Sequence, residues 1–351
     1  MTEPQKDLGQ TDARVTDYLK NIGETVADAV SHKLLHPMIE QYAQLFRNGA
    51  RTPVLRRPDD YGMEFEEVTF PASYGVPLEG WYIPADSNRL LIVNHPMTCN
   101  RYGYPGHLSP WNVMFGGFEV NFLPELKHLH GAGYNILTYD LRNCGLSGSA
   151  NGGISGLGLL ECRDVVGSVR YAKSRKDLAS MATALYSRCM GGNSTIIAMA
   201  KWPDEFQHVQ ALVLLNVVSG RTSIERGAEN LRLDPEKAAR QLDERLRELT
   251  GFRLDEETPE PYAHAVKVPT LMAQLRRDFL IHAEKDGKAI FDALGAAEKE
   301  LLWIEESNQR FYAYNHFGQH PERLVGWFDQ HMKQTADGEK IGVEKGAVAF
   351  R

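Results

Sequence analysis

One cysteine, Cys189, lies in a sequence context typical of a nucleophile. Small residues stand two positions before it and two positions after it, at Ser187 and Gly191. A strand-forming stretch, residues 182–186, precedes this segment, and a helix-forming stretch, residues 191–201, follows it. A cysteine at such a turn meets the backbone N–H groups and the positive dipole end of the following helix, which stabilise a thiolate. A buried structural cysteine is the alternative, and it is common for this residue type.

The rest of the chain supplies the elements that would hold this turn in place. Strand-like and helix-like stretches alternate from residue 64 onward. Strands are expected at residues 66–70, 78–83, 89–94, 134–140, 182–186, 209–217, 269–275 and 300–305. Helices are expected at residues 124–132, 160–174, 191–201, 285–294 and 321–332. Apolar strands that alternate with helices indicate an α/β fold with a mainly parallel, doubly wound sheet, which here has an antiparallel start.

We expect the chain to divide into an N-terminal helical arm (1–62), a core (63–218 and 265–335), a helical cap inserted into the core (219–264) and a C-terminal tail (336–351). The cap segment has no strand pattern and carries a charged helix that begins near Asp234. Such an insertion either covers the carboxyl edge of the sheet, where open α/β sheets bind ligands, or is a solvated decoration. The arm has an apolar stripe with helical spacing, from Tyr18 through Val30 to Leu35. Either the arm's own domain or a second subunit in a homodimer must cover this stripe.

The turn at Cys189 resembles the nucleophile elbow of the α/β-hydrolase superfamily, whose usual pattern is Gly-x-Ser-x-Gly. The resemblance extends over residues 64–332 and includes the segment from Tyr139 to Gly148, which looks like the superfamily's Asp-x-Arg-x-x-Gly-x-Ser loop. That loop is usually structural, so we do not place it in the active site. Dienelactone hydrolases of this superfamily also carry cysteine at the elbow. The resemblance therefore implies an α/β-hydrolase fold with Cys189 as its nucleophile.

The resemblance also implies an oxyanion hole beside the nucleophile. In these hydrolases one donor is the backbone N–H of the residue after the nucleophile, which is Met190 here. The second donor follows an apolar strand at a place where the family carries His-Gly and this chain carries His95 and Pro96. Because proline has no N–H, we expect Met97 to donate. Arg101 lies in the next connection, which we expect to form a pocket wall, and it would pair either with a substrate carboxylate or with a structural partner.

The resemblance further concerns the acid and the base of a catalytic triad. Asp278 follows a predicted strand where the family carries the carboxylate that orients the catalytic imidazole; a solvated loop aspartate is the alternative. Gln309 stands where a histidine is expected, and glutamine cannot take a proton near neutral pH. Three histidines are candidates for the missing base, each also with a surface or structural interpretation: His282, His316 and His320. We select His316, on the same loop as Gln309, as the residue that would complete a triad.

The range of possible substrates is smaller if no histidine acts as a base for Cys189. A serine hydroxyl needs a base, whereas a thiolate held by amides and a helix dipole is already a nucleophile. We therefore expect a hydrolase or acyltransferase that forms a thioacyl-enzyme from an activated small-molecule ester, lactone or thioester. An amide is a poor substrate because its leaving group needs a proton donor, and transfer or cyclisation could compete with hydrolysis because water needs a base. The alternatives are a non-hydrolytic enzyme (a lyase, a cyclase or C–C bond chemistry) and a catalytically inactive binding protein.

Composition limits the remaining functions. The 351 residues carry a net charge of −7, which argues against a nucleic-acid partner because a basic face is needed to neutralise phosphates. The four cysteines make no short-spaced pair, and no dinucleotide or Walker A motif occurs, so we expect neither a metal nor a cofactor. The N-terminus lacks an apolar signal, and no apolar run reaches the roughly 18 residues of a membrane span. These features favour a cytoplasmic protein that does not bind membranes.

Overall fold

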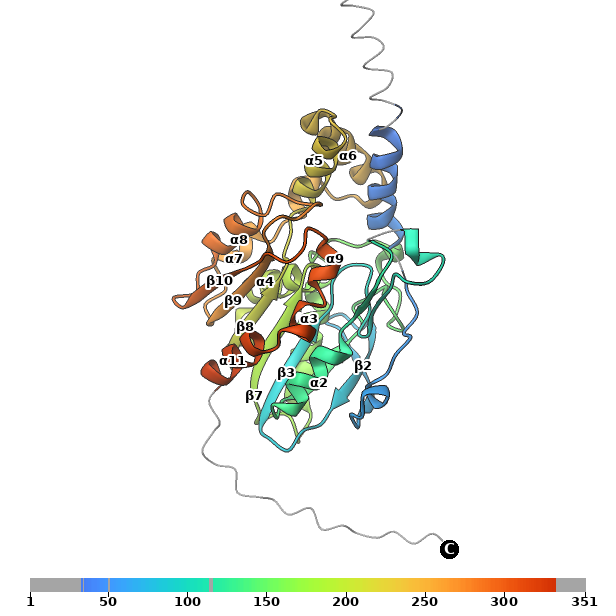
Figure 1. The fold of residues 1–351 in the computed structure, drawn as a ribbon. Coiled ribbons are helices and arrows are strands. Elements are labelled where there is room, and N and C mark those ends of the chain that lie inside the picture. The colour runs from blue at the N-terminus through green and yellow to red at the C-terminus, as the bar shows by residue number, and fades with distance from the viewer. Residues whose placement is uncertain (1–32, 34, 50, 114–115, 333–351) are drawn as a thin grey trace, which may run out of the picture.

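An eight-stranded sheet forms the centre of the molecule, with the strand order β1-β2-β6-β3-β7-β8-β9-β10 (Figure 1). The computed structural model describes residues 33, 35–49, 51–113 and 116–332. The strands of the sheet are β1 (Glu66–Pro71), β2 (Pro77–Ile83), β3 (Arg89–Asn94), β6 (Asn135–Tyr139), β7 (Ala182–Arg188), β8 (Val209–Leu215), β9 (Thr270–Leu275) and β10 (Lys299–Ile304). Each corresponds to a stretch predicted as a strand. A separate two-stranded sheet, β4 (Gly103–Pro105) and β5 (Glu119–Asn121), was not predicted.

The sheet is mainly parallel, as predicted. Only β1 with β2 and β2 with β6 pair in antiparallel fashion, and every other neighbouring pair is parallel. Every residue of the central strands β6, β7 and β9 is buried, which explains their continuous apolar sequences. The α/β class with a doubly wound sheet is therefore confirmed.

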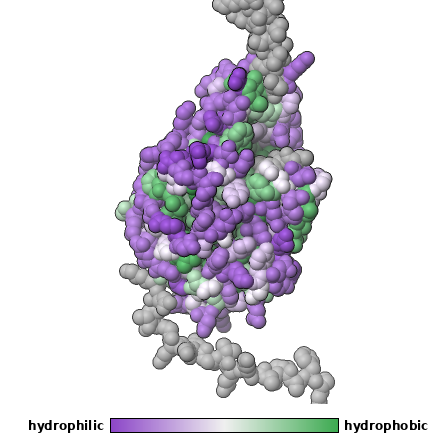
Figure 2. Space-filling model, viewed as in Figure 1, coloured by the Kyte–Doolittle hydropathy of each residue, from purple (hydrophilic) through white to green (hydrophobic). Residues whose placement is uncertain are grey.

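Helices cover both faces of this sheet (Figure 1). The helices of the core are α2 (Leu123–Gly131), α3 (Cys162–Ser174), α4 (Met190–Lys201), α8 (Gly287–Ala293), α9 (Arg310–Ala313), α10 (His316–Gln319) and α11 (Glu322–His331). Short 3-10 turns are η1 (Pro58–Tyr61), η2 (Trp111–Val113), η3 (Asn151–Gly153) and η4 (Pro203–Phe206). Figure 2 shows that hydrophilic residues dominate the viewed surface, with apolar residues scattered among them.

Between β8 and β9 the chain forms α5 (Gly220–Asn230), α6 (Pro235–Thr250), η5 (Leu254–Glu256) and α7 (Glu260–Ala263). The Asp234 side chain caps α6 by accepting a hydrogen bond from the Lys237 N–H at 3.1 Å, and Gly251 ends the helix with a φ of 82°. Within the described residues, no helix combines the length and apolar character that a membrane span needs.

The described part of the expected arm (1–62) includes a helix over residues 35–48, here called the arm helix. It lies beside α5 and α6 (Figure 1). Arg245 of α6 donates two hydrogen bonds to the Glu40 carboxylate, at 2.9 and 3.1 Å, and this pairing lowers the pKa of Glu40 to about 2. The buried apolar side chains of the arm helix are Leu35, Ile39, Ala43 and Phe46. This stripe therefore packs on its own chain, whereas the predicted stripe from Tyr18 to Val30 and the predicted tail (336–351) lie outside the described residues.

Candidate active site

Cys189 occupies a sharp turn between β7 and α4. Its φ of 47° and ψ of −116° place a non-glycine residue in a rarely populated region, and such outliers concentrate at functional sites. The Cys189 N–H donates to the Leu215 carbonyl at 2.8 Å, and the Asn193 N–H donates to the Cys189 carbonyl at 2.8 Å. The turn is therefore tied to the end of β8 on one side and to the first turn of α4 on the other.

Gly191 is required because neighbouring backbone approaches the turn closely. A Cβ at this position would stand 2.7 Å from the His95 carbonyl oxygen and 2.8 Å from Asn94 Cβ. Both contacts involve parts of the chain that cannot rotate away. The preference for a small residue at position 191, which the sequence pattern indicated, therefore has a steric explanation.

Gly191→Ala is expected to destabilise the protein by about 1–3 kcal/mol, the usual cost of overpacking a rigid site. Urea titrations followed by circular dichroism would measure the change in the free energy of unfolding. Gly326→Ala is the matched control, because a Cβ at Gly326, within α11, meets nothing within 4 Å. Alanine there should be neutral or stabilising by about 0.5–1 kcal/mol. Equal effects of the two substitutions would contradict the steric account.

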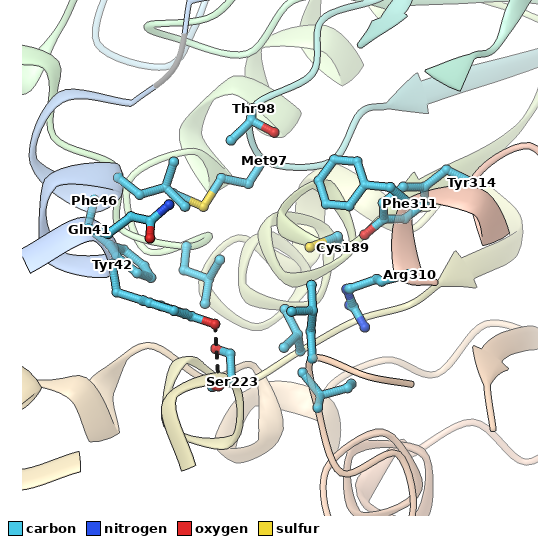
Figure 3. Close-up of a pocket in the computed structure, with 15 residues that line it drawn as sticks. Gln41, Tyr42, Phe46, Met97, Thr98, Cys189, Ser223, Arg310, Phe311 and Tyr314 are labelled. Atoms are coloured by element: carbon cyan, nitrogen blue, oxygen red, sulfur yellow. Dashed lines mark hydrogen bonds between the residues drawn. The ribbon is translucent and has the colours of Figure 1, made fainter. Parts of the chain in front are cut away.

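Cys189 lines a cavity of about 340 Å³ (Figure 3). The residue is 7% exposed, and its sulfur points toward the open space between the labelled residues. The arm helix contributes one wall with Gln41, Tyr42, Leu45 and Phe46. The other walls are also largely apolar and include Leu157, Val218, Leu280 and Ile281. Chain segments far apart in the sequence therefore converge on one sulfur atom.

Arg310, not a histidine, lies next to Asp278. Its Nη1 donates to Asp278 Oδ2 at 2.6 Å, its Nη2 donates to the Asn216 carbonyl, and both side chains are buried. Arg310 also lines the cavity with Cys189. Although burial disfavours the charge, Tyr314 and Asp278 raise the pKa of Arg310 well above its usual value. The expected imidazole beside Asp278 is thus corrected to a permanently charged guanidinium.

Tyr314 is a further residue of the site that the sequence did not indicate. It lines the same cavity as Cys189, and its ring packs edge-on against Phe311 with centroids 5.4 Å apart. Burial raises the pKa of Tyr314 well above its usual value, and the nearby Cys189 acts in the same direction. The hydroxyl is therefore neutral and can donate a hydrogen bond to a negatively charged sulfur.

The structure does not bring the candidate histidines to the cavity. His316 is not among the described residues that line it; its Nδ1 lies 2.9 Å from Glu306 Oε2. His320 is half exposed beside the same carboxylate, and His282 pairs with Glu229 at 2.6 Å. His316 therefore does not complete a triad with Asp278. The residue that does contact Asp278 follows Gln309, an exposed residue, by one position.

The two predicted oxyanion donors border the site. Met190 is the first residue of α4, so its N–H has no carbonyl one turn earlier to bind. Met97 lines the cavity, and its N–H has no hydrogen-bond acceptor within the part of the chain that the structure describes. Among the described residues, both N–H groups are therefore without a backbone acceptor beside the sulfur.

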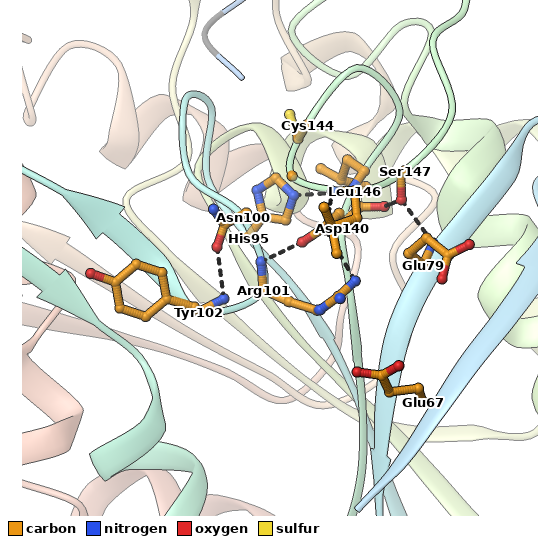
Figure 4. Close-up of polar contacts among 12 residues, drawn as sticks. Glu67, Glu79, His95, Asn100, Arg101, Tyr102, Asp140, Cys144, Leu146 and Ser147 are labelled. Atoms are coloured by element: carbon orange, nitrogen blue, oxygen red, sulfur yellow. Dashed lines mark hydrogen bonds and ion pairs between the residues drawn. The ribbon is translucent and has the colours of Figure 1, made fainter. Parts of the chain in front are cut away.

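His95 and Arg101 belong to a structural network, not to the cavity wall (Figure 4). His95 Nε2 accepts from the Leu141 N–H at 2.9 Å, so Nδ1 carries the proton and donates to the Pro96 carbonyl at 2.7 Å. Burial lowers the pKa of His95 to about 4, so the ring is neutral. The Arg101 guanidinium pairs with buried Asp140 at 3.1 Å and is therefore not available to a substrate carboxylate.

Comparisons with known sequences give partial matches to this chain. No family model matches the chain. "Uncharacterized protein YfhR" of Salmonella typhi is 28% identical over 174 residues, which cover 46% of this chain and 52% of that protein. Its counterpart in Escherichia coli O157:H7 is 28% identical over 167 residues, 45% of this chain and 50% of that protein. The chain thus spans about half the length of these curated relatives.

Solved structures match over a larger share of the chain. The Pyrococcus furiosus esterase Pf2001 superimposes with a TM-score of 0.60 and 19% identity, covering 82% of this chain and 100% of the esterase. The hydrolase GrgF from Penicillium sp. sh18 gives a TM-score of 0.51 and 16% identity over 77% of this chain and 99% of GrgF. At these identities the comparison concerns the fold. Together with the sheet order and the turn at Cys189, it shows that the chain has an α/β-hydrolase fold.

Proposed function

We propose that this chain is a cysteine-dependent hydrolase or acyltransferase that forms a thioacyl-enzyme on Cys189 from an activated ester, lactone or thioester. One observation carries the proposal. The sulfur stands at a strained elbow in the wall of a largely apolar cavity, between the start of α4 and a buried guanidinium.

Three groups favour negative charge on this sulfur. The first is the N-terminus of α4, whose dipole and free N–H groups face the elbow. The second is Arg310, and the third is the Tyr314 hydroxyl; both residues line the same cavity as the sulfur. A thiolate is the nucleophilic form of cysteine, so these contacts replace the activation that a histidine supplies in a serine hydrolase.

The acylation step follows from this arrangement. The thiolate attacks the carbonyl carbon, and the N–H groups of Met190 and Met97 bind the oxygen that becomes negative. The carbonyl then re-forms, the bond to the leaving group breaks, and that group departs with the electron pair as a thiolate, an enolate or a phenolate. None of these leaving groups has to be protonated as it departs. Activated acyl groups therefore suit the site better than amides.

The cavity favours an uncharged, apolar acyl group. The charge of Arg310 is paired with Asp278, and the other walls are largely apolar. A volume of about 340 Å³ lies at the small end of the range for ligand pockets, roughly 300–1,000 Å³. We therefore propose a small substrate without a carboxylate near the reacting carbonyl.

Deacylation distinguishes hydrolysis from transfer. Arg310 cannot take a proton from water, because a guanidinium has no acceptor and does not deprotonate in proteins. A thiol or an amine needs less help than water, since it is the better nucleophile. We therefore propose that an added acceptor competes effectively with water for the thioacyl-enzyme.

Mass spectrometry of the acylated protein tests this function. Mixing the enzyme with a short-chain aryl ester or thioester, then quenching in acid, should add the mass of one acyl group. Peptide mapping should place it on Cys189. The other cysteines are buried, and burial raises the pKa of the thiols of Cys99, Cys144 and Cys162. Added thiol should shorten the lifetime of the adduct.

Cys162→Ala is the matched control and should acylate normally. Turnover of the ester by Cys189→Ala at the wild-type rate, or an adduct on another residue, would contradict the proposal. The guanidinium in the place of the imidazole also favours a second candidate, a binding protein without turnover. Saturable binding of the ester with no adduct and no product would support that candidate instead.

A further inference from the structure

Glu306, His316 and His320 form a cluster outside the cavity. Glu306 lies in the loop between β10 and α9, and the two histidines lie four residues apart, at the start of α10 and just after its end. One side-chain N or O atom from each of the three residues lies within 4.8 Å of the others. His316 Nδ1 is 2.9 Å from Glu306 Oε2, and His320 Nε2 is 3.8 Å from Glu306 Oε1. We refer to these residues as the Glu306 cluster.

The donor set of the Glu306 cluster suits a transition metal. Two imidazole nitrogens and one carboxylate oxygen are typical zinc ligands, whereas magnesium and calcium prefer oxygen alone. At zinc–ligand distances of about 2.0–2.1 Å, tetrahedral ligand atoms lie about 3.3 Å apart. The separations of 2.9 Å to Glu306 Oε2 and 3.8 Å to Glu306 Oε1 stand on either side of that value, and one donor atom from each residue lies within 4.8 Å of the others. The Glu306 carboxylate and the exposed His320 side chain would have to rotate to bring one oxygen and two ring nitrogens to one ion.

A hydrogen bond between His316 and Glu306 accounts for only part of this arrangement. It explains why Glu306 and His316 are paired, and it does not involve His320, whose Nε2 lies 3.8 Å from Glu306 Oε1. The His320 ring stands 5.0 Å from the His316 ring between centroids, and its side chain is 53% exposed. His316, in contrast, is 11% exposed and held by the carboxylate, so one ligand of the site is already oriented.

We propose that the Glu306 cluster binds one divalent transition metal ion of the zinc class, with water at a fourth position. The ligands flank the segment that carries Arg310, Phe311 and Tyr314, all of which line the cavity. A metal would join the two ends of that segment and hold it in the conformation that places Arg310 on Asp278. The proposal concerns binding and stability, and it stands independently of the reaction assigned to Cys189.

Metal titration of the full-length chain tests the proposal. After treatment with a chelator and its removal, zinc sulfate should bind with a stoichiometry of one by calorimetry and raise the melting temperature, because a ligand of the folded state alone stabilises it. Cobalt(II) should give the visible absorption of a four-coordinate site. Magnesium should do neither. The titrations are repeated in Cys189→Ala, so that binding of zinc by the active-site thiol is separated from binding at the Glu306 cluster.

His320→Ala is the informative variant, because this exposed side chain makes little contribution to packing. It should weaken zinc binding by more than about tenfold, since even the loss of an outer-shell partner costs roughly 10–100-fold. Glu306→Gln should act in the same direction. His107→Ala, at an exposed position, is the control and should bind zinc as the wild type does. Equal zinc affinity in His320→Ala and the wild type, or no stabilisation by zinc in the wild type, would overturn the proposal.

Discussion

Cys189→Ser is expected to be nearly as inactive as Cys189→Ala, within about tenfold in kcat/KM toward an activated ester. A positioned general base contributes about 10²–10⁴-fold, and serine cannot react without that contribution. In a triad Asp278 would bind the catalytic histidine, but here it binds Arg310, and a guanidinium accepts no proton. A thiolate needs no such base, so we expect the native cysteine to react in this pocket and a serine not to. Steady-state kinetics with an aryl ester would compare the three proteins.

Two controls support the interpretation of that comparison. Circular dichroism and the melting temperature should be unchanged in Cys189→Ser, since a hydroxyl replaces a thiol of similar size in the cavity wall. The double variant Cys189→Ser/Arg310→His restores the residue types of a serine hydrolase beside Asp278 and should exceed Cys189→Ser in activity. A single serine variant with more than a tenth of the wild-type activity would show that another group serves as the base.

The elbow and the sheet could be predicted because their signals are local. The strands are continuous apolar runs, and a small residue is needed at Gly191 because the end of β3 lies against the turn. Arg310 could not be predicted in the same way. Its role depends on Asn216 and Asp278, 94 and 32 residues earlier in the chain, which only the folded sheet brings together. The sequence motif led to Gln309, which stands where a histidine is expected, and to His316 as the base, and nothing in the motif singled out Arg310 between them.

Two polar residues inside the recognised motifs do not have the roles that the sequence predicted, because each binds another part of the chain. His95 and Arg101 follow β3 as expected, but the ring binds the backbone of Leu141 and the guanidinium binds Asp140. Residue type and order along the chain do not reveal which buried partner a side chain finds. The arm helix illustrates the same limit, because Tyr42 reaches the Ser223 carbonyl, 181 residues away, to border the cavity.

Arg310→Met is expected to destabilise the protein by about 3–5 kcal/mol, because it leaves the Asp278 carboxylate buried without its counterion. Urea titration would give the change in the free energy of unfolding. Arg276→Met is the matched control on the same side of the sheet. Its ion pairs with Glu284 and Glu305 are partly exposed, so its loss should cost less than about 1 kcal/mol.

The double variant Arg310→Met/Asp278→Leu separates stability from chemistry. Replacing a buried ion pair by apolar groups is often neutral, so much of the lost stability should return. Under the proposed function activity should not return, because the guanidinium beside Cys189, whose positive charge favours a nucleophilic thiolate, is gone. A folded double variant that acylates at the wild-type rate would show that Arg310 only neutralises Asp278. The helix dipole and Tyr314 would then be sufficient to activate the cysteine.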